Sequence, residues 1–293
     1  MPAPPADEAA LLAQMLGARS NPAAPASTAP RPSTPAGWRV AAVVTAALAG
    51  LLAVGWAMGQ IEGAWSPAAQ TLAMSAAVIM LAAVAGRVAG TGLMGFGVRW
   101  RHWSWVGAAM GLGAIAWCAL SLALGGRLTE TREFAGIVTL GGMAVTLAQV
   151  SAEEMLFRGA IQPAIGRIAP PLAAIAGTAA AFALLHLAGA WDAPLTALNI
   201  FLAGCWLGLL AERSHGLVAP VAAHWGWNAG ELTGLGLFPN PGTGPWGALW
   251  GHDIVAGAVW GGGQEGLNAS FLATMVLGAM TLALLAVRRR AEI

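Results

Sequence analysis

The stretch from Val40 to Gly59, VAAVVTAALAGLLAVGWAMG, is a run of 20 residues without a charged side chain. An α-helix rises 1.5 Å per residue, so about 20 such residues cross roughly 30 Å of hydrocarbon. A membrane β-strand needs only about ten residues and alternates apolar with polar side chains, which this run does not. The stretch therefore predicts a transmembrane α-helix.

The whole chain has the same character. Of its 293 residues 57% are hydrophobic and only 9% are charged, whereas a soluble domain carries roughly a quarter charged residues. Apolar windows recur along the chain and predict an all-α, multi-pass bundle of about eight transmembrane helices. These windows are 40–59, 67–86, 105–125, 134 onward, 171–187, 194–211, 217–235 and 268–287.

The arginines predict how this bundle is oriented. With eight helices, all but two of the 14 basic residues fall on the side of the N-terminus, the exceptions being Arg127 and Arg132. Basic residues concentrate in cytoplasmic loops, so we expect both termini in the cytoplasm and the protein in the cell membrane. The chain has no lysine and is rich in alanine and glycine, a bias typical of GC-rich bacterial genomes. A net charge of +1 gives no support for nucleic-acid binding.

Small residues and cysteines in the spans have structural interpretations. Gly107, Gly111 and Gly113 are expected to allow close helix packing. Cys118 and Cys205 lie in apolar runs and are expected to be buried free thiols.

The stretch VSAEEMLFRG, Val150–Gly159, places three charged residues inside the fourth span. Charges are costly in a membrane, so each is a candidate functional residue. Glu154 and Arg158 are four residues apart with the acid first, the favourable arrangement for an ion pair within a helix. Glu153 is rotated by about 100° from Glu154. We therefore expect Glu154 and Arg158 to brace the site and Glu153 to be free for chemistry.

Two later spans add polar residues. His186 follows Phe182 by four residues, and Phe182 is expected to pack beside the site. His224 and Asn228 share one helix face. Glu231 either continues that face or simply ends the helix.

This set of residues suggests water activation, in two versions that the sequence leaves open. In one, Glu153 deprotonates a water with help from His186, while His224 and Asn228 stabilise an oxyanion. In the other, Glu153, His186 and His224 hold a divalent metal such as zinc. The HExxH, GxGD and GxSG signatures of other membrane proteases are missing.

Three ordered motifs, EEMLFRG, FALLH and HWGWN, resemble those of the CAAX prenyl protease and bacteriocin-processing family, also called CPBP or Abi. The likeness covers about residues 141–236. It implies an intramembrane endopeptidase with Glu153, His186, His224 and Asn228 as the catalytic set. It also implies supporting roles for Glu154 and Arg158, and a membrane-associated peptide or protein as substrate. Eukaryotic members remove the last three residues of prenylated CAAX proteins.

The expected organisation has five parts. They are a disordered Pro/Ala-rich cytoplasmic tail (1–37), three accessory helices (38–133), the CPBP-like catalytic core (134–236), an extracytoplasmic Gly/Trp-rich loop (237–267) and a last helix with an Arg-rich cytoplasmic tail (268–293). The substrate and the oligomeric state stay open.

Two other functions would use the same residues or helices. A proton-coupled transporter could use Glu153 and the histidines as a relay, but the halves show no internal symmetry. A non-catalytic immunity or scaffold protein could keep the helices, but the intact motifs argue against it.

Overall fold

The computed structural model describes residues 37–61, 63, 65–131, 136–187, 194–242 and 244–286, all within one compact unit. The expected N-terminal tail (except Gly37) and the Arg-rich C-terminal end lie outside the described residues. Every predicted apolar window contains a helix in its described part, which confirms the all-α multi-pass class.

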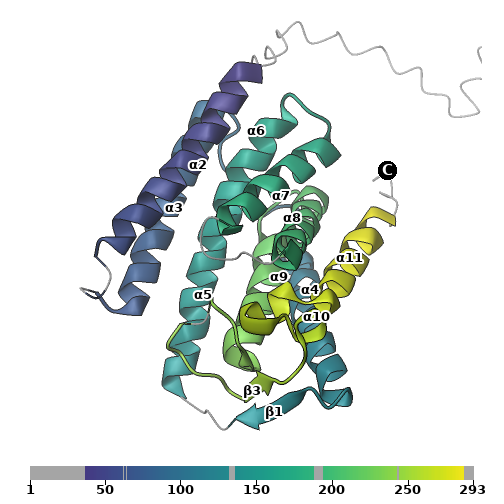
Figure 1. Cartoon of the computed structure of the whole chain (residues 1–293). Helices are drawn as coiled ribbons and strands as arrows, with labels where there is room; N and C mark the ends of the chain where they lie inside the picture. Colours follow the sequence, from purple (N-terminus) through teal and green to yellow (C-terminus); the bar gives the residue numbers. More distant parts are fainter. Residues whose placement is uncertain are drawn as a thin grey trace, which may run out of the picture. The chain divides into compact units, whose positions relative to one another are not determined.

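The long helices follow the predicted windows closely (Figure 1). They are α2 (Gly37–Gly59), α3 (Pro67–Ala89), α4 (Trp100–Leu124), α5 (Ile137–Leu156), α7 (Pro171–Leu187), α8 (Pro194–Ser214), α9 (Val218–Ala229) and α11 (Phe271–Ala286). Two π-helical turns extend this set: η1 (Phe157–Ile161) joins α5 to α6 (Gln162–Gly166), and η2 (Gly230–Gly234) continues α9.

Within the described residues, five helical segments are long and apolar enough to cross a membrane. They are α2, α3, α4, α8 and the segment Gly263–Ala286, which combines the 3₁₀-helix η3 (Gly263–Ala269) with α11. The shorter α7 is also apolar. Crossing by the α5–α6, α7 and α9–η2 segments stays a prediction.

Large apolar side chains on these helices face outward. Trp105 is 77% exposed on α4, Trp56 is 70% exposed on α2, and Met80 is 64% exposed on α3. Exposed apolar area on this scale is unfavourable in water but matches the hydrocarbon of a bilayer. The outward faces therefore agree with a membrane environment.

Helix packing brings the polar segments together (Figure 1). α3 contacts both α2 and α5, and α7 pairs with α8, which also contacts α11. α9 contacts α4, α5 and α8, so it lies at the centre of the helices that carry the candidate site.

The α4–α9 crossing depends on glycine. A Cβ atom at Gly107 would lie 2.2 Å from the Ala219 carbonyl oxygen, and one at Gly111 would lie 2.1 Å from the Ala223 carbonyl oxygen. Both distances are too short for any side chain, which confirms the predicted packing role of these two glycines. The prediction for Gly113 is wrong, because a Cβ there meets no atom within 4 Å.

The segment after η2, which the sequence predicts only as a loop, carries a small sheet. Strand β3 (Gly251–Ile254) pairs antiparallel with β1 (Leu128–Thr131), and β2 (Leu237–Phe238) pairs parallel with β3. The short helix α10 (Ala258–Gly261) and η3 follow. The sheet joins the segment after α4 to the segment after α9.

Cys118 and Cys205 are free, as expected. Cys118 is buried, whereas Cys205 is partly exposed.

Candidate active site

The Glu154–Arg158 pair forms as the helical spacing predicts. Arg158 Nη1 donates to Glu154 Oε1 at 2.7 Å, and both side chains are fully buried. Arg158 Nη2 also donates to the Gly204 carbonyl oxygen at 3.2 Å. The guanidinium carbon lies 4.8 Å from the centre of the Phe182 ring. The pair is thus enclosed by α8 and α7 as well as by its own helix.

Glu154 has a second partner that the sequence did not reveal. His224 Nδ1 lies 2.8 Å from the same oxygen, Glu154 Oε1. A carboxylate only accepts hydrogen bonds, so His224 Nδ1 carries a proton and donates it. Glu154 therefore fixes both the orientation and the tautomer of His224, in addition to pairing with Arg158.

The other nitrogen of His224 faces the remaining polar residues. Asn228 Nδ2 lies 3.3 Å from His224 Nε2, one turn further along α9. Glu153 Oε2 lies 3.8 Å from the same nitrogen. His224 thus stands between a buried carboxylate, Glu154, and an accessible one, Glu153.

Glu153 is the accessible carboxylate of the two. Its side chain is 23% exposed, whereas that of Glu154 is fully buried. Gln149 Nε2 donates to Glu153 Oε1 at 3.1 Å from one turn earlier on α5. This bond orients one oxygen of Glu153 and leaves the other toward His224. Gln149 was not among the predicted site residues, although its four-residue spacing from Glu153 places it on the same helix face.

An aromatic cluster holds His186. Its Nδ1 donates to the Phe182 carbonyl oxygen at 2.9 Å, and its ring centre is 4.4 Å from that of Phe182. The Phe182 ring also meets Phe157 edge-on at 4.9 Å and His224 at 6.2 Å. Phe182 therefore packs against both histidines. The hydrogen bond to the Phe182 carbonyl oxygen uses Nδ1 of His186 and does not involve its Nε2.

The π-helical turn η1 begins directly after the acidic pair. All five of its residues are buried, including Arg158. A π turn pairs residues five apart, and such turns are common at functional sites. One of its carbonyl groups, that of Gly159, accepts from the Met94 amide at 3.3 Å, which ties this turn to the segment after α3.

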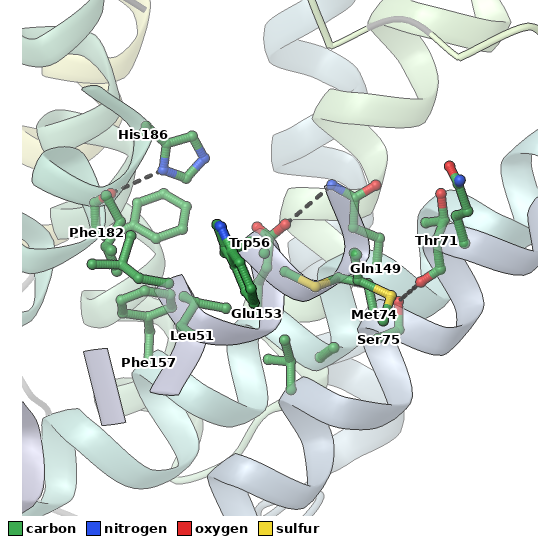
Figure 2. A pocket seen from close by; sticks show the side chains of 17 residues that line it. Leu51, Trp56, Thr71, Met74, Ser75, Gln149, Glu153, Phe157, Phe182 and His186 are labelled. Carbon is green, nitrogen blue, oxygen red and sulfur yellow. Dashed lines mark hydrogen bonds between the residues drawn. The ribbon is translucent and has the colours of Figure 1, made fainter. Parts of the chain in front are cut away.

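Two cavities meet at Glu153. The larger, of about 740 Å³, lies between α2 and α3 on one side and α5 and α7 on the other. Figure 2 shows Glu153 bonded to Gln149, with Phe182 and His186 across this cavity. The smaller, of about 230 Å³, extends past His224 and Asn228 to Glu231. Gln149, Glu153, Phe182 and His186 line both cavities.

The predicted metal ligands do not form a metal site in this arrangement. Within the described residues, no three His, Cys, Asp or Glu side chains lie close enough together to hold a metal ion. Glu153 Oε2 lies 3.8 Å from His224 Nε2, but within the described residues His186 does not complete a group of three with them. A catalytic zinc site takes three protein ligands, so these side chains would have to move to supply them.

Fold and site together define an α-helical, multi-pass membrane protein with a carboxylate–histidine–amide cluster inside its helical core. Residues 135–230 match the family model "Type II CAAX prenyl endopeptidase Rce1-like". The matched segment is about a third of the chain and contains all three motifs, which confirms the resemblance seen in them. The match supports a membrane endopeptidase in general. No curated protein and no solved structure matches the chain.

Proposed function

We propose that this protein is an intramembrane endopeptidase of the CAAX-protease type, which hydrolyses a peptide bond in a membrane-associated protein or peptide. The observation that carries the proposal is that two adjacent glutamates occupy different positions around His224. Buried Glu154 holds His224 from behind, while accessible Glu153 faces the other His224 nitrogen at the junction of two cavities.

Glu153 is the general base. A water near Glu153 Oε2 gives its proton to this carboxylate and attacks the substrate carbonyl carbon. When the tetrahedral intermediate collapses, the carbon–nitrogen bond breaks and Glu153 returns the proton to the leaving amine. One water is consumed, and a carboxylic acid and an amine are released. His186 lines both cavities together with Glu153. Its Nε2 helps to hold the attacking water through a hydrogen bond.

Asn228 and His224 stabilise the oxyanion. Asn228 Nδ2 donates to His224 Nε2 in the resting state. When a substrate oxygen lies between the two side chains, Asn228 Nδ2 donates to that oxygen instead. In the form that carries a proton on both ring nitrogens, His224 supplies a second donor from Nε2, while its Nδ1 stays bonded to Glu154. Each such donor typically contributes about 2.7–4 kcal/mol.

The cavities suggest how a substrate lies. Apolar side chains from α2 and α3, among them Leu51, Trp56 and Met74, line the larger cavity and suit the membrane-anchored part of the substrate. The smaller, more polar cavity takes the peptide beyond the scissile bond. Glu153 lies where the two meet. The accessory helices would thus take part in substrate binding, although they lie outside the Rce1-like segment.

The test uses the full-length protein in detergent or in lipid nanodiscs, with a library of quenched fluorescent peptides. Wild type is compared with Glu153→Gln, which keeps the size of the side chain but removes its basicity. Glu130→Gln is the matched control, because Glu130 is an exposed carboxylate on β1. We expect cleavage by wild type and Glu130→Gln and loss of at least about 10²-fold in Glu153→Gln. Full activity in Glu153→Gln would refute the role of Glu153.

A chelator arm addresses the metal version. Turnover that survives a chelator supports water activation by Glu153 alone. Turnover that a chelator abolishes and Zn²⁺ restores requires a metal, and Glu153, His186 and His224 would then be tested as its ligands.

A further inference from the structure

Glu231 is a buried carboxylate at the far end of the smaller cavity. It lies in η2 and is only 1% exposed. Asn240 Nδ2 donates to its Oε1 at 2.8 Å, and Asn268 Nδ2 lies 3.2 Å from each of its oxygens. These amides are neutral donors. In the described part of the chain, no arginine or histidine forms an ion pair with Glu231.

The cavity that Glu231 lines is acidic. Glu153 lies at its other end, and neither an arginine nor a lysine lines it. His186 and His224 also line it, and the Nδ1 of His224 bonds to Glu154 rather than to Glu231. Two carboxylates in a confined, poorly solvated space favour a positively charged guest, because Coulomb attraction is stronger there than in water.

Size and spacing fit one residue of a bound peptide. The volume of about 230 Å³ equals that of roughly eight water molecules. Glu231 is seven residues beyond His224, or about 10 Å along the helix. An extended peptide advances about 3.3–3.6 Å per residue, so Glu231 lies about three residues from the scissile bond.

We propose that the smaller cavity is a substrate subsite in which Glu231, held by Asn240 and Asn268, binds a basic side chain, lysine or arginine, about three residues from the cleaved bond. This inference rests on the proposed function for the position of that bond. It also disfavours substrates whose C-terminus lies about three residues beyond the cleaved bond. A free carboxylate entering this cavity would lie against Glu231 and be repelled.

The test compares peptides that differ at one position, scanned from four residues before to four residues after the bond. Each position carries lysine, norleucine or glutamate. In wild type we expect lysine at one position, about three residues from the bond, to raise kcat/KM roughly 10- to 100-fold over norleucine, as a charged hydrogen bond would. Equal rates at every position would overturn the inference, and this comparison requires no variant to fold.

Two variants then assign the preference to Glu231. Glu231→Gln keeps the size and one acceptor oxygen but removes the charge, so the lysine preference should vanish. Glu231→Asp keeps the charge and should retain the preference. Persistence of the preference in Glu231→Gln, or a loss of stability there without any change in preference, would mean that Glu231 only anchors the loop.

A measurement of peptide binding distinguishes a failure of this inference from a failure of the proposed function. In the Glu153→Gln background, affinities of the lysine and norleucine peptides are measured by fluorescence anisotropy. Tighter binding of the lysine peptide, lost when Glu231→Gln is added, supports the subsite whether or not peptides are cleaved. Cleavage that does not depend on Glu153 contradicts the proposed function alone. Equal affinities contradict the subsite alone.

Discussion

Replacing Glu154 with glutamine removes a charge from the site with little change in shape. Both partners of Glu154, Arg158 Nη1 and His224 Nδ1, bond to the same oxygen, Oε1. The other oxygen, Oε2, is buried without a hydrogen-bond partner in the structure. A glutamine can therefore keep its carbonyl oxygen at the Oε1 position and place its NH₂ group where Oε2 lies. Both bonds can remain, but the counter-charge is gone.

The expected cost comes mainly from Arg158. Its side chain is fully buried, its Nε has no partner, and its remaining acceptor is the Gly204 carbonyl oxygen. Leaving a buried charge without its partner costs about 3–5 kcal/mol. For a protein of this size, that corresponds to roughly 6–20 °C in the unfolding midpoint. The substitution also removes the negative charge behind His224, which weakens the oxyanion donor at Nε2, so kcat should fall by about 10²–10³, as when one oxyanion donor is lost.

The assay combines thermal unfolding in detergent, followed by tryptophan fluorescence, with peptide cleavage. Arg158→Met in the Glu154→Gln background removes the unpaired charge, so most of the stability should return. Activity should recover much less, because His224 still lacks the negative charge of Glu154 at its Nδ1. A Glu154→Gln variant with wild-type stability and activity would refute this reasoning. So would a double variant no more stable than the single one.

Three further changes test other parts of the structure. Asn228→Ala should lower kcat by about 10²–10³ with little change in KM, because it removes an oxyanion donor; an unchanged kcat would exclude Asn228 from that role. Gly111→Ala should destabilise the fold by at least about 1–3 kcal/mol, since its Cβ would overlap the Ala223 carbonyl oxygen, whereas Gly113→Ala should be close to neutral in the same unfolding assay. Met74→Trp should narrow the larger cavity and raise KM for peptides with a bulky apolar anchor while leaving kcat nearly unchanged; an unaltered KM would show that this cavity does not bind the anchor.

Local features were predictable because they depend on one helix at a time. Apolar windows located the long helices to within a few residues, as for Pro67–Ala89 against the predicted 67–86. The start of α4 was placed too late, at residue 105, since its first turn contains Arg101 and His102 and so does not read as apolar. The β1–β3–β2 sheet was missed because strands of two to four residues carry no readable periodicity.

Distances between helices were not predictable in the same way. Spacing along α5 predicted the Glu154–Arg158 pair, but the bond from Glu154 to His224 joins residues 70 positions apart. Residue counts along single helices do not fix the distances between helices. They could not show which carboxylate would reach which histidine nitrogen.

The sequence by itself predicted the class of protein and the residues that we propose to carry its chemistry. The length of the apolar runs predicts membrane-spanning helices, and the period of 3.6 residues per turn predicts which side chains share a helix face. Only the tertiary structure decided that both glutamates meet His224, Glu154 at Nδ1 and Glu153 at Nε2. These contacts depend on how α5 and α9 approach each other, and no spacing within one helix encodes that approach.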